Sequence, residues 1–413
     1  MVAEIVYVST IFLSCLISFI MIIHSGVNQG EFEGRDLLNL STLDIISTFI
    51  FFSFILFFSL SFCYLCNKKK VSRFFGFRLR LIETRVHGIL FIILVAQVVF
   101  VLTTGVGRLL SNASSPYSPI FFLLDPSVFV ILYYLSYRKC AKKIFIVNII
   151  LLFVWKISQG WTGIFLILGL CELCYLSTKI KRRKVKVLGV IFAPILVFCL
   201  GGAAYTVLYP LKNKIRGIDH GEITYSQGIS KLASRLSNLP VALAADNEME
   251  KLSKLFVSDN VVLKEIYAIG RPILPSFLMK DKSFRTLSNN IVEIYYPGIT
   301  NSTGSNMGLY MYSKVLWISD VIQFFYCFLI IFFITACYKI LCDMLEQSPS
   351  QLNFMFSLFV IQIVDVSALE MIVGYNFLKF AIFLCFMFIF GCIKLVKIEN
   401  GVSKWKGHEH EHL

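Results

Sequence analysis

Charged residues are scarce in this chain of 413 residues, because only 15% are Asp, Glu, Lys or Arg. A soluble domain carries about 25%. Mean hydropathy is +0.75, 57% of the residues are hydrophobic, and Phe alone occurs 40 times. This composition argues against an ordinary soluble enzyme and favours a membrane protein built from apolar helices of about 20 residues.

Motifs of soluble enzymes are also missing. The chain contains no G-x-G-x-x-G, P-loop, H-E-x-x-H or G-x-S-x-G pattern, so a nucleotide site is unsupported. The twelve cysteines avoid the stretch from Tyr205 to Lys314 and lie in or beside apolar segments, which indicates no disulfide framework. Cys171 and Cys174 form one C-x-x-C inside an apolar helix, where packing explains them better than metal binding. We expect no cofactor and no metal ion.

The apolar runs predict an all-α polytopic membrane protein with about ten spanning helices. They fall at about 5–23, 44–65, 88–106, 119–137, 144–157, 161–178, 187–209, 315–338, 353–372 and 376–396. The predicted organisation is helices 1–7 in residues 1–209, one large helical loop in 210–314, helices 8–10 in 315–397 and a tail in 398–413. The tail ends in GHEHEHL, which looks like the remnant of a tag.

Loop charge predicts the orientation. The segments NKKKVSRFFGFRLRLIETR, RKCAKK and KIKRRKVK and the C-terminal tail are rich in Lys and Arg, and all fall on the side that holds both termini. The positive-inside rule makes that side cytoplasmic. The net charge of +14 therefore indicates membrane orientation rather than nucleic-acid binding. The 210–314 loop is then outside, in the periplasm of a Gram-negative cell.

Helical patterning in the outer loop indicates that it is a folded unit. The apolar residues Ile229, Leu232, Ala233, Leu236 and Leu239 are expected to share one helix face, and Pro240 is expected to end or kink that helix. A second helix is predicted over 241–256.

Basic and titratable side chains of this loop are candidate site residues. Arg216, Arg235 and Arg271 suit a diphosphate clamp, because guanidinium groups bind phosphate oxygens in bidentate fashion; a solvated face or lipid contact is the alternative. His220 lies between two acidic residues in IDHGE, which suits a general base, although an exposed loop histidine explains it equally well. Glu293 is the reserve base.

Polar residues at the ends of, or inside, the spans form a second set. Lys156 and Trp161 lie in WKISQGWTG, where a phosphate contact beside a sugar-stacking ring competes with interfacial anchoring. Lys379 is expected to pair with Asp365 or Glu370 across neighbouring helices, as a structural ion pair or a transport pathway. Asp125 and Glu172 are weaker cases of the same kind.

The chain resembles the O-antigen polymerase (Wzy) family of the GT-C-like polymerase and ligase superfamily. The resemblance rests on the helix count, the inward termini, the late outer loop, and the segments KISQGWTG, SRLSNLP and NSTGSNMGLYMY. The chain departs from many members in having only a short turn, 156–163, where they carry an earlier periplasmic loop.

This resemblance implies a glycosyltransferase of the inner membrane that joins undecaprenyl-diphosphate-linked oligosaccharides on the periplasmic face. Membrane lipid and a chain-length regulator protein are the implied partners, and nucleic acid is not one. The resemblance fits the diphosphate and base residues above, and Trp161, Tyr225, Tyr295 and Tyr296 would stack on sugars.

Three other functions fit the same sequence features. An O-antigen ligase would use the same donor with a different acceptor. A flippase or secondary transporter would have more intramembrane charge, inverted repeats and shorter loops. A structural membrane protein is the third alternative.

Overall fold

The computed structural model describes residues 2–68, 76–107, 113, 115–140, 142–161, 163–180, 183–215, 223–257, 287–297, 308–319, 321–366 and 376–397. Helices dominate this part of the chain, and the expected all-α membrane fold is confirmed at that level. Within the residues that the structure describes, six helical segments are long and apolar enough to cross a bilayer: Val2–Ser25, Thr42–Lys68, Glu83–Thr104, Ser118–Tyr137, Leu188–Leu211 and Val321–Met344. The count of about ten spans stays a prediction.

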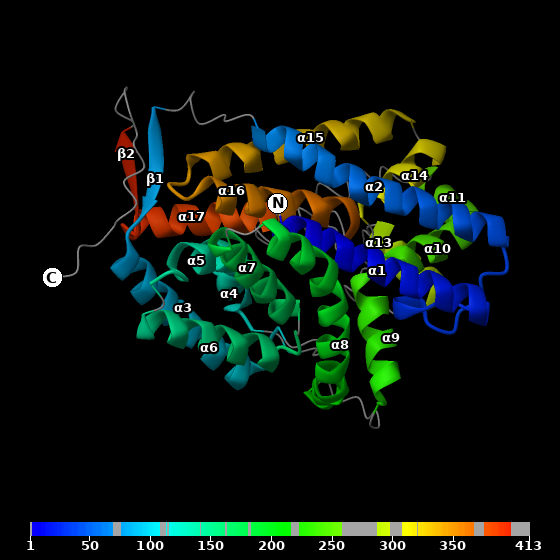
Figure 1. Cartoon of the computed structure of the whole chain (residues 1–413), viewed down its shortest axis with the longest axis horizontal. Coiled ribbons are helices and arrows are strands. Elements are labelled where there is room, and N and C mark those ends of the chain that lie inside the picture. The colour runs from blue at the N-terminus through cyan, green and yellow to red at the C-terminus, as the bar shows by residue number, and fades with distance from the viewer. Residues whose placement is uncertain are drawn as a thin grey trace.

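The first helix, α1 (Val2–Ser25), lies at the centre of the bundle. It packs against α2 (Thr42–Lys68), α7 (Gly163–Lys179), α8 (Arg183–Ile215) and α16 (Pro349–Ile361). A second group pairs α3 (Glu83–Thr104) with α6 (Lys143–Ser158). In Figure 1, α1, α2, α15 (Val321–Met344), α16 and α17 (Lys379–Ile389) run nearly horizontally, whereas α8 is drawn nearly upright.

A two-stranded antiparallel sheet closes the left-hand end of the bundle in Figure 1. It pairs β1 (Phe77–Leu81) with β2 (Ile393–Lys397), so that Arg80 lies opposite Lys394. β1 lies inside the basic segment predicted as a connection between two helices, and no strand was expected there. The last spanning helix was predicted to run to 396, which was wrong, since α17 ends at Ile389 and Ile393–Lys397 form a strand.

A group of shorter helices comes from the predicted outer loop and the start of the predicted eighth span: α9 (Tyr225–Leu236), α10 (Leu239–Asn247), α11 (Met249–Val257), α13 (Leu287–Tyr295) and α14 (Leu309–Ser319). In Figure 1, α10, α11 and α14 lie toward the right-hand end, whereas α9 stands nearly upright beside α8. The predicted helix over 241–256 is in fact two helices that meet at Glu248. Pro240 does not end α9, which stops at Leu236; it lies in the first turn of α10, where its missing N–H costs nothing.

Close packing joins α9 to α8 and explains the apolar face predicted for α9. Ile229 lies over Gly202 and Leu232 over Gly201, while Gly228 approaches the Gly202 backbone. Thr224 caps the helix in a capping box with Gln227. Glycines on both helices allow this approach because neither carries a Cβ.

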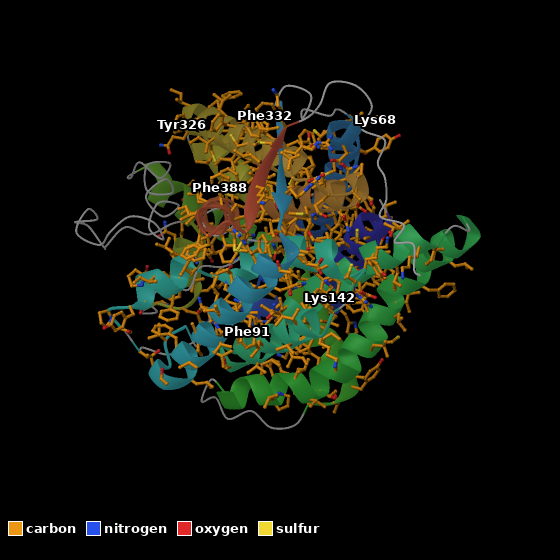
Figure 2. All side chains as sticks on the ribbon, turned by 90° about the vertical axis from the view of Figure 1, so that its left-hand side faces the viewer. Lys68, Phe91, Lys142, Tyr326, Phe332 and Phe388 are labelled. Atoms are coloured by element: carbon orange, nitrogen blue, oxygen red, sulfur yellow. The ribbon has the colours of Figure 1, made fainter. Side chains whose placement is uncertain are left out.

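The outer surface of the bundle is apolar. Large side chains such as Phe58 (60% exposed), Phe192 (59%) and Phe332 (64%) face outward, and Figure 2 shows Phe332 and Phe388 in its upper half and Phe91 in its lower half. An apolar exterior of this extent suits contact with lipid. Together with the long apolar helices, it supports a membrane-embedded protein.

Candidate functional site

The fourth predicted span is interrupted at Asp125, and this break puts a carboxylate inside the bundle. α4 (Ser118–Leu123) stops short of it, and the 3-10 turn η3 (Pro126–Phe129) leads into α5 (Val130–Tyr137). The Asp125 side chain accepts a hydrogen bond of 2.8 Å from the backbone N–H of Ser127. An Asp followed by Pro starts a helical turn well, so the sequence itself sets the break.

Two lysines from distant segments meet the two oxygens of the Asp125 carboxylate. Nζ of Lys156, in the last turn of α6, lies 3.9 Å from Oδ1, and Nζ of Lys379, at the start of α17, lies 3.9 Å from Oδ2. The Lys379 side chain is buried, at 2% exposed, and the Lys156 side chain is part-buried, at 12% exposed. A close charged hydrogen bond spans about 2.7–2.9 Å, so each ammonium is near the carboxylate without being locked onto it. We call Asp125, Lys156 and Lys379 the lysine–aspartate cluster.

Aromatic rings and one amide complete the surroundings of Lys156. Its Nζ lies 3.4 Å from the Gln159 side-chain oxygen and 3.9 Å from the centroid of the Trp155 ring. The Trp161 ring lies 6.0 Å away and is 43% exposed. Gly160 makes the turn between them with a φ of 78°, a conformation that glycine adopts easily. The structure therefore brings Lys156 and Trp161 together, as the predicted diphosphate and sugar contacts require.

The depth of this cluster follows from helix geometry. Lys156 lies 13 residues beyond the start of α6 at Lys143, next to the basic RKCAKK segment. At 1.5 Å per residue this is about 20 Å of rise. Lys379 similarly lies at the end of α17 remote from β2. The cluster therefore lies in the half of the bundle away from the basic loops.

The predicted residues of α13 lie elsewhere, at the right-hand end of Figure 1. Tyr295 is buried, and its hydroxyl donates to the Ala244 carbonyl at 2.9 Å and accepts from the Asn247 side-chain amide at 3.3 Å. Burial raises the pKa of Tyr295 to about 12. Its neighbour Tyr296 holds the guanidinium of Arg35 over its ring at 4.7 Å. These contacts explain both tyrosines as structural residues, and their sugar contacts stay a prediction, as does the reserve role of Glu293 in the same helix.

Two further predicted residues lie on α9. Tyr225 is 48% exposed and its hydroxyl donates to the Cys199 carbonyl of α8 at 3.2 Å. Arg235 is exposed in the last turn of the same helix. Arg216, His220 and Arg271 lie outside the described residues. The candidate residues that can be placed thus fall on three elements: the α6–α7 turn, α9 and α13.

The sequence indicated the charges of the cluster but not how they pair. Lys379 was expected to pair with Asp365 or Glu370. In the structure its ammonium lies beside the Asp125 carboxylate. The Asp365 side chain and all of Glu370 lie outside the described residues. The Asp125–Pro126 pair inside an apolar run was the feature of the sequence that could have indicated the break in this span. Glu172 was the other intramembrane carboxylate noted in the sequence. Its carboxylate has structural partners, since Arg138 binds it in bidentate fashion at 2.7 and 2.9 Å and the Tyr134 hydroxyl donates to it at 2.6 Å.

Among the described residues, no group of three or more His, Cys, Asp or Glu side chains is arranged to hold a metal ion. The polar groups at the lysine–aspartate cluster are the two lysine ammonium groups, the Asp125 carboxylate and the side-chain amide of Gln159. Comparisons of the chain with protein-family models, with curated proteins and with solved structures found no match.

Proposed function

We propose that the chain is a glycosyltransferase that polymerises undecaprenyl-diphosphate-linked oligosaccharide repeat units into O-antigen or a related surface polysaccharide. The observation that supports this most directly is the lysine–aspartate cluster beside Trp161. In the proposed orientation both termini are cytoplasmic, the membrane is the bacterial inner membrane, and the cluster faces the periplasmic half.

A buried ammonium is suited to a diphosphate leaving group. As the glycosidic bond to the diphosphate breaks, negative charge grows on the phosphate oxygens, and a fixed cation in an apolar site stabilises that charge more strongly than water does. Lys156 is the best candidate, because its contacts with Gln159 and Asp125, at 3.4 and 3.9 Å, are long enough to yield to a phosphate oxygen. Asp125 lies beside both lysines and partly offsets the cost of burying their charge before substrate arrives.

The reaction needs a proton acceptor as well as an anion site. A hydroxyl of one repeat unit attacks the anomeric carbon of the growing chain, the bond from that carbon to the diphosphate oxygen breaks, and undecaprenyl diphosphate leaves. His220 is the proposed base and Glu293 the reserve. Arg216, Arg235 and Arg271 would add guanidinium contacts to the diphosphate, and Tyr225 would support a sugar ring.

A transporter is the second candidate, and the same cluster favours it. A carboxylate and two lysines that meet between helices form the kind of group that carries protons or anions through transporters. An O-antigen ligase would use the same donor chemistry. These functions separate by product: a polymerase lengthens lipid-linked chains, a ligase moves chains to another acceptor, and a flippase changes only their side of the membrane.

The test uses the full chain in proteoliposomes with purified lipid-linked repeat unit, and the product is resolved as a ladder on a gel. We expect Lys156→Gln to lower the rate of chain extension by about 100-fold, the usual effect of removing one group that stabilises transition-state charge. Lys156→Arg should keep part of the rate, and Arg235→Ala should lose the long chains. Lys254→Gln is the matched control, since Lys254 is 74% exposed and pairs only with its helical neighbour Glu250 among the described residues.

A wild-type ladder from Lys156→Gln would remove the cluster from the proposed mechanism. Absence of any chain extension by the wild-type protein, together with movement of the lipid-linked repeat across the bilayer, would replace the polymerase with a flippase.

A further inference from the structure

The break in the fourth predicted span leaves the carbonyl end of a short helix inside the bundle. α4 is six residues long, and the last four carbonyl groups of a helix have no N–H partner within that helix. Pro126 cannot supply a partner from the following turn, because proline has no N–H. Carbonyl groups among apolar helices therefore need a donor from another element, since a buried polar group without a hydrogen bond is costly.

A glutamine of α3 supplies this donor. The side-chain nitrogen of Gln97 donates to the Phe121 carbonyl at 2.7 Å and to the Leu124 carbonyl at 3.0 Å. Gln97 is only 3% exposed, so the amide is held within the bundle. One side chain thus binds the end of α4 at two points, and the second point, Leu124, is the residue directly before Asp125.

Ring packing adds a second contact between α3 and the end of α4. The Phe100 ring stacks on the Phe121 ring, with centroids 3.9 Å apart and an angle of 5° between the planes. Residues three apart on a helix are neighbours on its surface, so Gln97 and Phe100 approach α4 from one face of α3. A hydrogen-bonding contact and an apolar contact together fix the backbone that leads to Asp125.

The segment after α3 also touches the second polar neighbour of Lys156. Gly107 has a φ of 84°, and a Cβ there would lie 3.0 Å from the side-chain nitrogen of Gln159. The side-chain oxygen of Gln159 lies 3.4 Å from Nζ of Lys156. α3 and its extension therefore lie behind both the Gln159 amide and the Asp125 carboxylate that face this ammonium.

We infer that Gln97 is a positioning residue of the lysine–aspartate cluster. It holds the break in the fourth span so that the Asp125 carboxylate lies between Lys156 and Lys379. Without the Gln97 amide the carbonyl end of α4 loses its donor, the turn before Asp125 shifts, and the carboxylate moves away from the lysines. The effect on chain extension rests on the proposed function, whereas the placement of Asp125 does not.

Acetylation of the purified full chain tests this placement directly. The chain in detergent is treated briefly with a small amine-reactive acetylating reagent, and modification of Lys156 is measured by mass spectrometry of its peptides. Asp125→Asn should raise the acetylation rate of Lys156 about tenfold, because an ammonium held by a carboxylate is a poor nucleophile. Gln97→Leu should raise the rate about threefold, since it displaces the carboxylate without removing it.

Asn148→Leu is the matched control for a merely structural effect. The Asn148 amide is 1% exposed on α6 and donates to the His87 carbonyl at 3.1 Å and to the Tyr133 hydroxyl at 2.9 Å. This variant therefore also loses two hydrogen bonds of a buried amide. His87 lies ten residues before Gln97 on α3, which is about 15 Å of helix rise, so the loss occurs away from the break.

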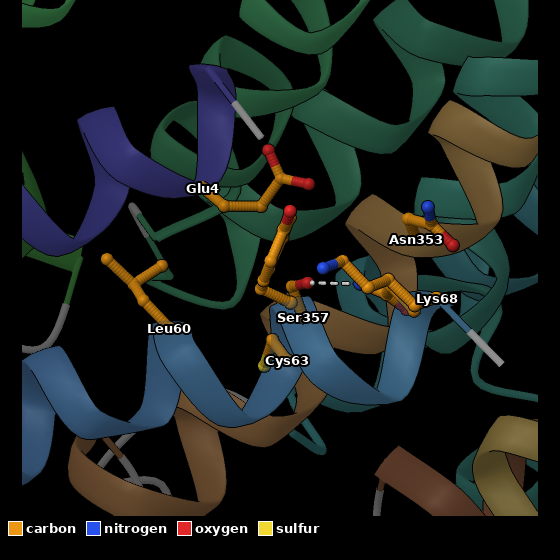
Figure 3. A pocket seen from close by; sticks show the side chains of 8 residues that line it. Glu4, Leu60, Cys63, Lys68, Asn353 and Ser357 are labelled. Atoms are coloured by element: carbon orange, nitrogen blue, oxygen red, sulfur yellow. Dashed lines mark hydrogen bonds between the residues drawn. The ribbon is translucent and has the colours of Figure 1, made fainter.

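Asn67→Leu is a second control, in another part of the bundle. Its amide donates to the Ser357 hydroxyl at 3.2 Å beside a cavity of about 150 Å³ between α1, α2 and α16 (Figure 3). Both control variants should lower the midpoint of thermal unfolding, as Gln97→Leu does, because each loses hydrogen bonds of a side-chain amide. Neither should change the acetylation rate of Lys156.

Three results would overturn the inference. The first is a wild-type acetylation rate in Gln97→Leu, and the second is an equal increase in Gln97→Leu and Asn148→Leu, which would indicate general loosening of the fold. The third is an unchanged rate in Asp125→Asn, since Gln97 acts through that carboxylate. If Gln97→Leu does not fold, Phe100→Leu tests the same contact through the stacked ring and should raise the rate by a smaller factor.

The proteoliposome assay measures the effect on the proposed function separately. Gln97→Leu should lower the rate of chain extension about tenfold, because a small displacement of a positioned group is costly to catalysis. A raised acetylation rate of Lys156 together with a wild-type ladder would confirm that Gln97 positions Asp125 and would contradict the proposed role of the cluster in polymerisation.

Discussion

At the scale of single residues, two groups of charges in the described part of the chain are paired across segments that are far apart in the sequence. Asp125 meets Lys156 and Lys379, and Asp246 accepts from Lys314 at 2.6 Å. Burying an ion is costly unless its partner is close, so the sequence alone shows that partners must exist. It cannot select them, since the choice depends on which helices pack together. This is why Lys156 could be singled out from the sequence, whereas its link to Lys379 through one carboxylate could not.

Tyr295 offers a test of the structural role that these contacts give it. Tyr295→Phe leaves the Ala244 carbonyl and the Asn247 amide without the hydroxyl, which should cost about 1 kcal/mol of unfolding free energy at neutral pH. Burial raises the pKa of this hydroxyl from 10.0 to about 12. The stabilisation is therefore complete below pH 10 and is lost as the pH rises toward 12, because only the unfolded chain ionises in that range.

Thermal unfolding of the wild type and of Tyr295→Phe between pH 8 and about 11.5 measures this effect. The advantage of the wild type should shrink above pH 10. Tyr326→Phe is the control, since that side chain is 49% exposed on α15. A gap between wild type and Tyr295→Phe that is constant with pH would contradict the assigned burial.

At the scale of elements, local patterns predicted helices well and their interruptions less well. The apolar face of α9 and the apolar runs of α1, α2 and α3 correspond to observed helices. The break at Asp125 was missed because an average over some 20 apolar residues hides one D-P pair. The β1–β2 pairing was missed for a different reason: it joins segments near opposite ends of the chain, and no local pattern fixes such a contact.

The α8–α9 contact gives a prediction at this scale. A Cβ at Gly228 would lie 2.6 Å from the Gly202 carbonyl oxygen and 3.4 Å from the Thr206 side chain. Because the nearest atom belongs to the backbone, Gly228→Ala must push α9 away from α8, at a cost of about 1–3 kcal/mol. A lower midpoint of thermal unfolding in detergent is the expected result.

Gly189→Ala on α8 is the matched control for that substitution. A Cβ there meets nothing within 4 Å, and replacing a helical glycine by alanine in open space is stabilising by about 0.5–1 kcal/mol. The two variants should therefore shift the midpoint in opposite directions. Equal shifts would mean that α9 does not pack against α8 through these glycines.

At the scale of the whole molecule, the two ends of the bundle differ in chemistry. One end carries the β1–β2 sheet with Arg78, Arg80, Lys394 and Lys397, together with the basic segment around Cys140. The other carries α10 and α11, anchored by the contacts of Asp246 with Lys314 and Thr48. Between them lies the apolar exterior. A membrane across the middle would leave the basic end in the cytoplasm under the positive-inside rule.

Cysteine labelling of intact cells tests this orientation, on which the proposed function of the lysine–aspartate cluster depends. Cys140 is exposed within the basic segment, so a membrane-impermeant maleimide should reach it only after the cells are opened. Glu250→Cys, in a background where Cys140 is replaced, puts a thiol on α11 at a position whose side chain is 83% exposed, and it should react in intact cells. The reverse pattern would turn the lysine–aspartate cluster toward the cytoplasm. There it could not meet a periplasmic lipid diphosphate, and the proposed polymerase mechanism would be excluded.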